Sequence, residues 1–153
     1  MIVPDVNLLV DAYDGDSEFH SAARSWWEAC LSGHETVALL PAVALGFVRL
    51  TTNPRVLGRC LRLAQALALV RSWQARPVVE LPEFGAAQLA TVFGVLEQLG
   101  AGGNLVTDAQ IAAAALELKG VVHTADSDFL RFPGVRWFNP ITGARGGRGL
   151  RTV

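Results

Sequence analysis

The sequence predicts an α/β protein, a three-layer α/β/α sandwich in which helices cover both faces of a short, mostly parallel sheet. Two observations carry this prediction. Short β-branched runs alternate with amphipathic helical patterns along the chain, which is typical of parallel strands joined by helices. With 153 residues, 51% of them hydrophobic, the chain can bury one substantial core but is too short for two ordinary domains. We therefore expect a single domain.

The first half of the sequence predicts two strands and three helices. Met1–Val3 is a short apolar run, and Pro4 can end a strand there because the hydrogen-bond ladder stops at that point. Asp5 is a candidate N-cap for the next helix, because its carboxylate can accept bonds from free backbone N–H groups. The other elements are expected as helices at residues 6–13, 17–32 and 41–52 and as a strand at residues 36–39.

The second half predicts three more helices and three more strands. The clearest unit is an alanine-rich helix from Thr107, a candidate N-cap, to Lys119, with a left-handed cap at Gly120. Val121–Thr124 follows at once and suits a buried parallel strand. The remaining elements are expected as helices at residues 59–74 and 82–99 and as strands at residues 78–80 and 135–138.

The predicted domain covers residues 1–142. From Gly143 onward the chain is mostly glycine and arginine, with little apolar surface to bury. Residues 143–153 are therefore expected to form a poorly ordered tail.

Composition excludes several classes of protein. The net charge of −1 excludes a protein that coats nucleic acid through net charge alone, although it permits a local cationic groove. Cys30 and Cys60 lack disulfide or metal-site spacing, so buried free thiols are expected, which favours the cytoplasm. Leu63–Val70 is far shorter than the roughly 20 residues needed to span a bilayer. We expect a soluble cytoplasmic protein with no membrane contact.

Four aspartates lie next to predicted strand ends or at a helix start. Asp5 follows the first strand, Asp108 opens the alanine-rich helix, and Asp126 and Asp128 follow a late strand. Each one alone is typical of an N-cap. Together, at the carboxyl edge of a parallel sheet, they would repel and raise one another's pKa unless a cation neutralised them. The pattern predicts a hard-cation site for Mg²⁺ or Mn²⁺.

Three ordered sequence blocks surround these aspartates. One follows the N-terminal strand, one opens a helix and one follows a late strand: Asp5-Val6-Asn7, Gly103-Asn104-Leu105-Val106-Thr107-Asp108-Ala109, and Thr124-Ala125-Asp126-Ser127-Asp128-Phe129. With Phe132-Pro133-Gly134 and Asn139-Pro140 behind them, the arrangement resembles PIN-domain ribonucleases. More narrowly, Arg49-Leu50-Thr51-Thr52-Asn53-Pro54-Arg55 is similar to the VapC toxins of bacterial toxin–antitoxin pairs.

The resemblance implies an α/β/α endoribonuclease that depends on Mg²⁺ or Mn²⁺ and hydrolyses RNA phosphodiester bonds with a metal-activated water. It also implies a toxin that a VapB-type antitoxin holds inactive, with transfer RNA and ribosomal RNA both compatible as substrates. A homodimer is implied in the same way. Trp26, Trp27 and Trp73 have the spacing of core or dimer-interface residues rather than of base-stacking ones.

The site residues are also implied by the resemblance. Asp5, Asp108 and Asp126 are the expected catalytic, metal-binding carboxylates. Asp128 is expected as an accessory acid or an orienting residue, and Asn7 as a group that hydrogen-bonds a carboxylate or the substrate. As an alternative for each acid, N-capping stays open.

Further accessory positions carry two interpretations each. Arg49 either contacts an RNA phosphate or an antitoxin carboxylate, or is an ordinary surface arginine. Asn104 is either a turn residue or a hydrogen-bond donor to the acids, and Thr107 suits an N-cap better than a substrate ligand. A basic rim or a solvated helix face accounts for Arg55, Arg59 and Arg62.

One departure from the family pattern falls at Gly46, where PIN-domain ribonucleases commonly carry a glutamate. No acid occurs between Glu35 and Glu80, so a small shift of alignment does not supply one. We hypothesise one well-occupied cation, with any second cation arriving with the RNA. The alternative function is a catalytically weakened PIN fold that binds RNA or antitoxin without cutting. An aspartate-nucleophile phosphatase is disfavoured, because the sole lysine, Lys119, lies at the far end of the central helix.

Overall fold

The central sheet has five parallel strands with a sixth strand added antiparallel at one edge. The structure, a computed structural model, describes residues 1–147, and all statements on its elements refer to that part of the chain. The strand order is β3-β2-β1-β4-β5-β6. The strands are β1 (Ile2–Pro4), β2 (Val37–Ala38), β3 (Val79–Glu80), β4 (Val121–His123), β5 (Trp137–Phe138) and β6 (Arg145–Gly146).

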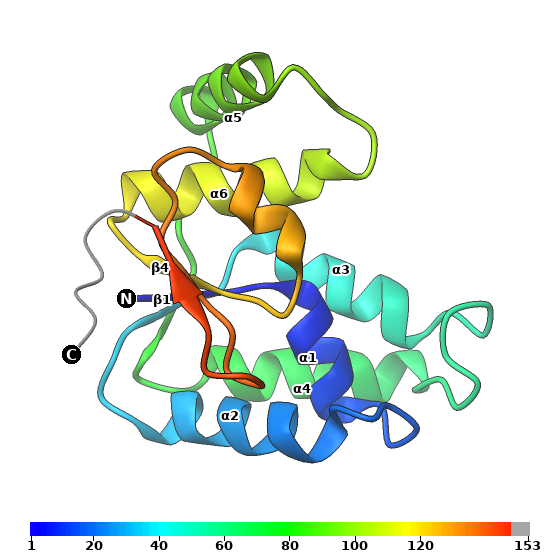
Figure 1. The fold of residues 1–153 in the computed structure, drawn as a ribbon. Coiled ribbons are helices and arrows are strands. Elements are labelled where there is room, and N and C mark those ends of the chain that lie inside the picture. Colours follow the sequence, from blue (N-terminus) through cyan, green and yellow to red (C-terminus); the bar gives the residue numbers. More distant parts are fainter. Residues whose placement is uncertain (148–153) are drawn as a thin grey trace.

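Helices cover both faces of this sheet, as predicted (Figure 1). On one face α6 packs against β1 and β4, and α5 lies against the outer side of α6. On the other face α1 packs against α2 and α3, and α3 packs against α4. The three-layer α/β/α prediction is confirmed. The helices are α1 (Val6–Tyr13), α2 (His20–Ser32), α3 (Pro41–Thr51), α4 (Leu63–Gln74), α5 (Ala86–Leu99), α6 (Leu105–Glu117) and the 3-10 helix η1 (Ser127–Arg131).

An aromatic cluster fills the core beneath the sheet. Trp73 meets Phe47 with ring centroids 4.7 Å apart and Trp27 with centroids 5.2 Å apart, both in edge-on geometry. Trp27 and Trp73 are buried within this chain, so they are unavailable to a dimer interface. Trp26 is only half-buried, and its indole N–H donates to His123 Nδ1 over 3.0 Å. The core alternative for the tryptophans therefore holds for two of the three.

Helix α6 begins at Leu105, so the predicted N-cap at Thr107 is wrong. The free N–H groups of Leu105 and Val106 donate to the carbonyls of Gly102 and Gly103. Because this glycine turn supplies acceptors from the backbone, the helix starts earlier and needs no side-chain cap. Thr107 then lies inside the first turn.

The end of α6 also differs from the prediction. The left-handed residue is Lys119, with φ +52°, rather than Gly120. Gly120 has a different purpose, because a Cβ there would lie 2.8 Å from Val3 Cγ2. Its lack of a side chain allows the chain to pass close to strand β1.

Two helices begin four residues later than predicted, α4 at Leu63 rather than residue 59 and α5 at Ala86 rather than residue 82. In each, a glutamine in the first turn accepts a hydrogen bond from the residue before the helix, Gln65 from Arg62 N–H and Gln88 from Gly85 N–H. These glutamines mark the true helix starts, because they satisfy one of the free N–H groups.

The segment from Gly143 is more ordered than expected over its first residues. Arg145 pairs with Phe138 in strand β6, and Gly143, at φ +78°, makes the tight return between the strands. Asn139 N–H donates to the Ala144 carbonyl over 2.7 Å, which closes this hairpin. The prediction of a disordered tail fails for residues 143–147, and residues 148–153 lie outside the described part of the chain.

The two cysteines are both free, but only Cys30 is buried, and Cys60 is exposed on the loop between α3 and α4. Among residues 1–147, no helix is both long and apolar enough to cross a membrane.

Candidate active site: an aspartate cluster at the carboxyl edge of the sheet

Strands β1 and β4 place Asp5 and Thr124 side by side. Pro4 pairs with His123, so the residues that follow them, Asp5 and Thr124, are neighbours. The N–H of Asp5 donates to the His123 carbonyl over 2.9 Å, and the Thr124 hydroxyl donates to Asp5 Oδ2 over 2.8 Å. Both side chains are buried. The neighbouring strand therefore holds the Asp5 carboxylate in one position.

The loop after β4 is held by two successive side chain–backbone hydrogen bonds. Thr124 Oγ1 accepts a bond from Asp126 N–H over 2.9 Å, and Asp126 Oδ1 accepts one from Asp128 N–H over 2.8 Å. Threonine and aspartate favour such local turns because their short side chains reach the backbone two residues on. These bonds fix the loop that carries Asp126 and Asp128, and the charge of Asp126 reaches Asp5.

Helix α6 brings the fourth carboxylate from the other side. Helix α6 ends shortly before β4 begins, so the end of the helix lies at the amino end of that strand. Its first turn, which contains Asp108, therefore lies at the carboxyl edge of the sheet. One carboxylate oxygen each from Asp108, Asp126 and Asp128 lies within 4.8 Å of the others. Acids from three distant segments thus meet at one end of the sheet.

The folded protein disfavours the charged forms of Asp5 and Asp108. Burial raises the pKa of Asp5 from 3.8 to about 6, against the Thr124 hydrogen bond and with a further rise from the charge of Asp126. Burial raises the pKa of Asp108 to about 7, and the charges of Asp5, Asp126 and Asp128 add to it. Asp5 stands outside the three-residue group by distance, but its charge reaches Asp108. The four carboxylates form one electrostatic unit, which we call the aspartate cluster.

The donor set of the aspartate cluster fits a hard divalent cation. It offers carboxylate oxygens and no sulfur or imidazole, which is the preference of Mg²⁺ and Mn²⁺. The raised pKa of Asp108 has the same implication: burial is its largest cause, and a cation among the carboxylates would relieve the repulsion that adds to it. We assign Asp108, Asp126 and Asp128 as candidate ligands, with Asp5 beside them.

The predicted accessory residues make fewer contacts than the aspartates. Asn7 is exposed on the first turn of α1, and within residues 1–147 its side chain donates no hydrogen bond to the acids. Asn104 is exposed at the N-cap position of α6 without a capping bond, and Thr107 is half-buried in the first turn. Arg49 is exposed on the last turn of α3. Roles for these four residues toward a substrate stay predictions.

Gly46 lies close to the start of α1. A Cβ built on Gly46 would lie 3.3 Å from Cγ2 of Val6, the residue that follows Asp5. The face of α3 that carries Gly46 therefore borders the aspartate cluster, at the position where a fifth acid is missing. A side chain at this position would displace Val6 by a few tenths of an ångström.

Sequence reasoning missed the role of Thr124. Its hydroxyl bonds both Asp5 and Asp126, and the available signal was a threonine directly after a strand and two residues before an aspartate. His123, by contrast, is structural. Burial lowers its pKa to about 4, so the ring is neutral, and it accepts the Trp26 N–H and packs edge-on against Phe138.

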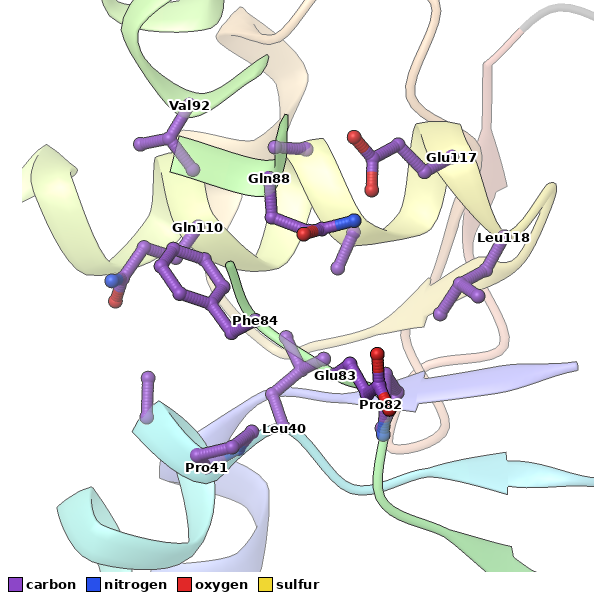
Figure 2. A pocket seen from close by; sticks show the side chains of 13 residues that line it. Leu40, Pro41, Pro82, Glu83, Phe84, Gln88, Val92, Gln110, Glu117 and Leu118 are labelled. Carbon is purple, nitrogen blue, oxygen red and sulfur yellow. The ribbon is translucent and has the colours of Figure 1, made fainter. Parts of the chain in front are cut away.

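A pocket of about 770 Å³ lies between α5, α6 and the start of α3, apart from the aspartate cluster (Figure 2). None of the four aspartates lines it. Its wall is mainly apolar, with polar groups from two glutamines and two glutamates: Gln88, Gln110, Glu83 and Glu117.

Comparison with known proteins identifies the fold that carries the cluster. Residues 2–135 match the model of the PIN domain family. The chain belongs to the PIN domain family. Its PIN domain is similar to Ribonuclease VapC33 of Mycobacterium tuberculosis, with 38% identity over 141 residues that cover 92% of this chain and 99% of that protein. Ribonuclease VapC37 of the same species is 36% identical over 140 residues, 92% of this chain and 97% of that protein.

Solved structures of PIN-domain proteins share the fold. A crystal structure of Mycobacterium tuberculosis VapC20, described as a Sarcin-Ricin loop cleaving toxin, has a TM-score of 0.67 at 18% identity and covers 85% of this chain and 93% of that one. VapBC2 from Rickettsia felis, bound to a promoter DNA fragment, has a TM-score of 0.65 at 20% identity over 91% and 98% of the two chains. At these identities the likeness concerns the fold alone.

Proposed function

We propose that this PIN-domain protein is a metal-dependent endoribonuclease and the toxin of a VapBC-type toxin–antitoxin pair. The observation that carries the proposal is the aspartate cluster, in which acids from three distant segments meet at the carboxyl edge of the sheet. Relatives at 36–38% identity over nearly the whole chain, named as VapC ribonucleases, support the same function.

We assign two different roles to the four aspartates. Asp108, Asp126 and Asp128 would hold a Mg²⁺ or Mn²⁺ ion, and Asp5 adds a buried negative charge next to them. When bound, the cation supplies charge neutralisation at a phosphate and makes water a better nucleophile at neutral pH. Thr124 keeps Asp5 and Asp126 at a fixed separation by bonding both. We expect Asn7, Asn104, Thr107 and Arg49 to contact the RNA.

Cleavage of RNA by purified variants tests the proposal. Total RNA incubated with the unaltered chain and Mg²⁺ or Mn²⁺ should yield discrete fragments, and EDTA should prevent them. Asp108→Asn and Asp126→Asn should each lower the rate by at least about a hundredfold, in line with the loss of a metal-centred charge-stabilising group. Glu97→Gln, an exposed acid on α5, is the matched control and should leave the rate unchanged. Equal rates for Asp108→Asn and Glu97→Gln contradict the proposal.

A second function is favoured by Gly46. A PIN fold without the fifth acid would bind RNA or an antitoxin and cut poorly or not at all. The two functions separate in the same assay, because a chain that retains RNA under Mg²⁺ and Mn²⁺ without producing new ends is a binding module. Mapping the new ends that cleavage produces in total RNA also identifies the substrate class. The residues of the site do not distinguish transfer RNA from ribosomal RNA.

The antitoxin partner is supported by related structures. VapBC and FitAB complexes are among the fold neighbours of this chain. We propose a VapB-type partner that covers the aspartate cluster in the cytoplasm. Co-purification of the full chain with a co-expressed antitoxin, and loss of RNA cleavage in the complex, is the expected result.

We also propose a homodimer, in which the partner copy covers the outer face of α5 and the segment before it. This face exposes apolar side chains that a monomer has no reason to keep in water: Leu81, Phe84, Leu89 and Phe93. Sedimentation should give twice the chain mass for the unaltered protein and the single mass for Phe93→Glu.

A further inference from the structure

The chain segregates its charge along the sequence. From residue 36 to residue 79 there is no aspartate or glutamate, whereas the same stretch contains six arginines and no lysine. The net charge of the whole chain is only −1, so the acids are concentrated elsewhere and this stretch is strongly cationic. The arginines are Arg49, Arg55, Arg59, Arg62, Arg71 and Arg76.

All six side chains are exposed and almost none is paired. Within residues 1–147, the one acid at ion-pair distance from any of them is Asp16, whose carboxylate lies 3.8 Å from Arg59 Nε with both groups in solvent. Such a surface pair is weak. Two arginines elsewhere are engaged: Arg24 pairs with Glu28, and Arg136 donates to the carbonyls of Lys119 and Gly120.

Four of the six arginines form one feature at the end of α3. Arg49 is in the last turn of α3, and Arg55, Arg59 and Arg62 follow on the loop to α4; we call these four residues the arginine loop. Helix α3 starts at the carboxyl edge of the sheet and runs away from it to this loop (Figure 1). The loop lies beside the end of α1, because Arg59 faces Asp16 over 3.8 Å. Gly46, one turn before Arg49, touches the residue after Asp5. Helix α3 therefore leads from the neighbourhood of Asp5 to the arginine loop.

The loop backbone is held in place, which fixes the points from which the arginine side chains extend. Leu57 is buried beneath the loop, Leu61 N–H donates to the Thr51 carbonyl over 2.7 Å, and Arg55 N–H donates to Asn53 Oδ1 over 2.9 Å. An ordered backbone loses less entropy when its side chains bind a ligand.

The arginine loop offsets the repulsion between the aspartate cluster and a phosphate chain. Four carboxylates repel an approaching phosphate chain, and one divalent cation offsets only part of that charge. An RNA strand would therefore be held poorly by the cluster alone. Arginine forks match phosphate oxygens in geometry, and arginine is the only cationic residue of the stretch.

We propose that the arginine loop is a binding site for the RNA backbone, which it binds through phosphates further along the strand from the one at the aspartate cluster. The inference rests on the proposed ribonuclease function and adds a site that contributes affinity without base readout. An acidic protein partner is the competing occupant. Phosphate is favoured because arginine forks match its oxygens and because α3 leads from the neighbourhood of Asp5 to this loop.

Salt dependence of RNA binding tests the loop. A fluorescent single-stranded RNA of mixed sequence is titrated with the full chain in EDTA, so that no cleavage occurs, and the Kd is measured over a range of salt concentrations. The variant carries Arg55→Gln, Arg59→Gln and Arg62→Gln together, and Arg49 is left intact because it lies on α3, whose Gly46 approaches Val6 next to Asp5. The matched control removes three charges at the opposite edge of the sheet: Arg71→Gln, Arg76→Gln and Lys119→Gln.

The expected result follows from counterion release. Each phosphate contact contributes about 0.7 to the slope of log K against log salt for a single strand, so three lost contacts should reduce the slope by about 2. The control should keep the slope of the unaltered chain. An unchanged slope for the loop variant, equal losses in both variants, or no salt-dependent RNA binding by the unaltered chain overturns the proposal.

A polyglutamate peptide as a second probe separates the two occupants. Loss of peptide binding with unchanged RNA binding in the loop variant overturns the proposal and assigns the loop to an acidic protein. The test is also independent of catalysis. A loop that grips RNA in a chain that never cuts it leaves the proposal standing and removes the ribonuclease function, whereas an unchanged slope in a chain that cuts RNA does the reverse.

Discussion

Replacing Asp5 with asparagine should stabilise the metal-free protein. Burial and the charge of Asp126 raise the pKa of Asp5 from 3.8 to about 6, so the folded state penalises its charged form. At about 1.4 kcal/mol per pKa unit this corresponds to about 3 kcal/mol. Asparagine has the same shape, still accepts the Thr124 hydrogen bond and is equally good as an N-cap. In EDTA at about pH 8, Asp5→Asn should unfold about 6–12 °C higher than the unaltered chain.

Proton linkage predicts how the stabilisation by Asp5→Asn changes with pH. The folded state binds the Asp5 proton more tightly than the unfolded state, so this group's stabilising contribution is present at low pH and is lost as pH rises through about 6. The advantage of Asp5→Asn should therefore be full at about pH 8 and small at about pH 4. Thermal unfolding followed by circular dichroism measures both.

Adding a divalent cation should reverse the order of the unfolding temperatures of the unaltered chain and Asp5→Asn. Mg²⁺ or Mn²⁺ binds only the folded aspartate cluster, so it should raise the unfolding temperature of the unaltered chain more than that of Asp5→Asn. Glu97→Gln, which removes an exposed carboxylate, should match the unaltered chain throughout. If Asp5→Asn unfolds at or below the temperature of the unaltered chain in EDTA at about pH 8, the cluster is not under electrostatic strain and the reasoning fails.

Three further substitutions probe the neighbouring groups. Thr124→Val leaves Asp5 Oδ2 without its hydrogen bond and should lower the Mn²⁺ affinity by about 10-fold or more, whereas Thr124→Ser should restore it; equal affinity for valine and serine contradicts the positioning role. Trp26→Phe removes the donor to the half-buried His123 Nδ1 and should cost about 1–3 kcal/mol in urea unfolding without changing RNA cleavage; no loss of stability would contradict a stabilising role for this bond. Gly46→Glu adds an acid beside the cluster, so a Mn²⁺ titration should reveal a second equivalent, and saturation at one equivalent would count against the missing-ligand interpretation.

Local sequence signals were sufficient to predict the layers and the acids. Apolar runs and helix-start residues act over a few positions, and a parallel sheet necessarily aligns its carboxyl ends, so Asp5 and Asp126 were predictable as neighbours. The helix starts were less predictable. The early start of α6 depends on carbonyls of Gly102 and Gly103 in a particular turn, which residue preference does not encode.

Features that depend on tertiary placement were missed. The hairpin of β6 forms because Gly143 adopts a left-handed conformation and the returning chain finds the edge of β5, whereas composition alone indicated disorder. The role of Asp128 as an accessory acid or orienting residue stays a prediction, but spacing did not indicate that its oxygen lies with those of Asp108 and Asp126. Such side-chain directions follow from the folded loop and not from spacing.

Direct titration of Mn²⁺ into the metal-free full chain tests the central claim, which is that the aspartate cluster is a cation site. We expect one strong equivalent at about pH 8, where Asp5 and Asp108 are charged, and its loss in a variant with Asp108→Asn and Asp126→Asn. Strong Mn²⁺ binding that survives both substitutions, or no binding by the unaltered chain, would contradict the account.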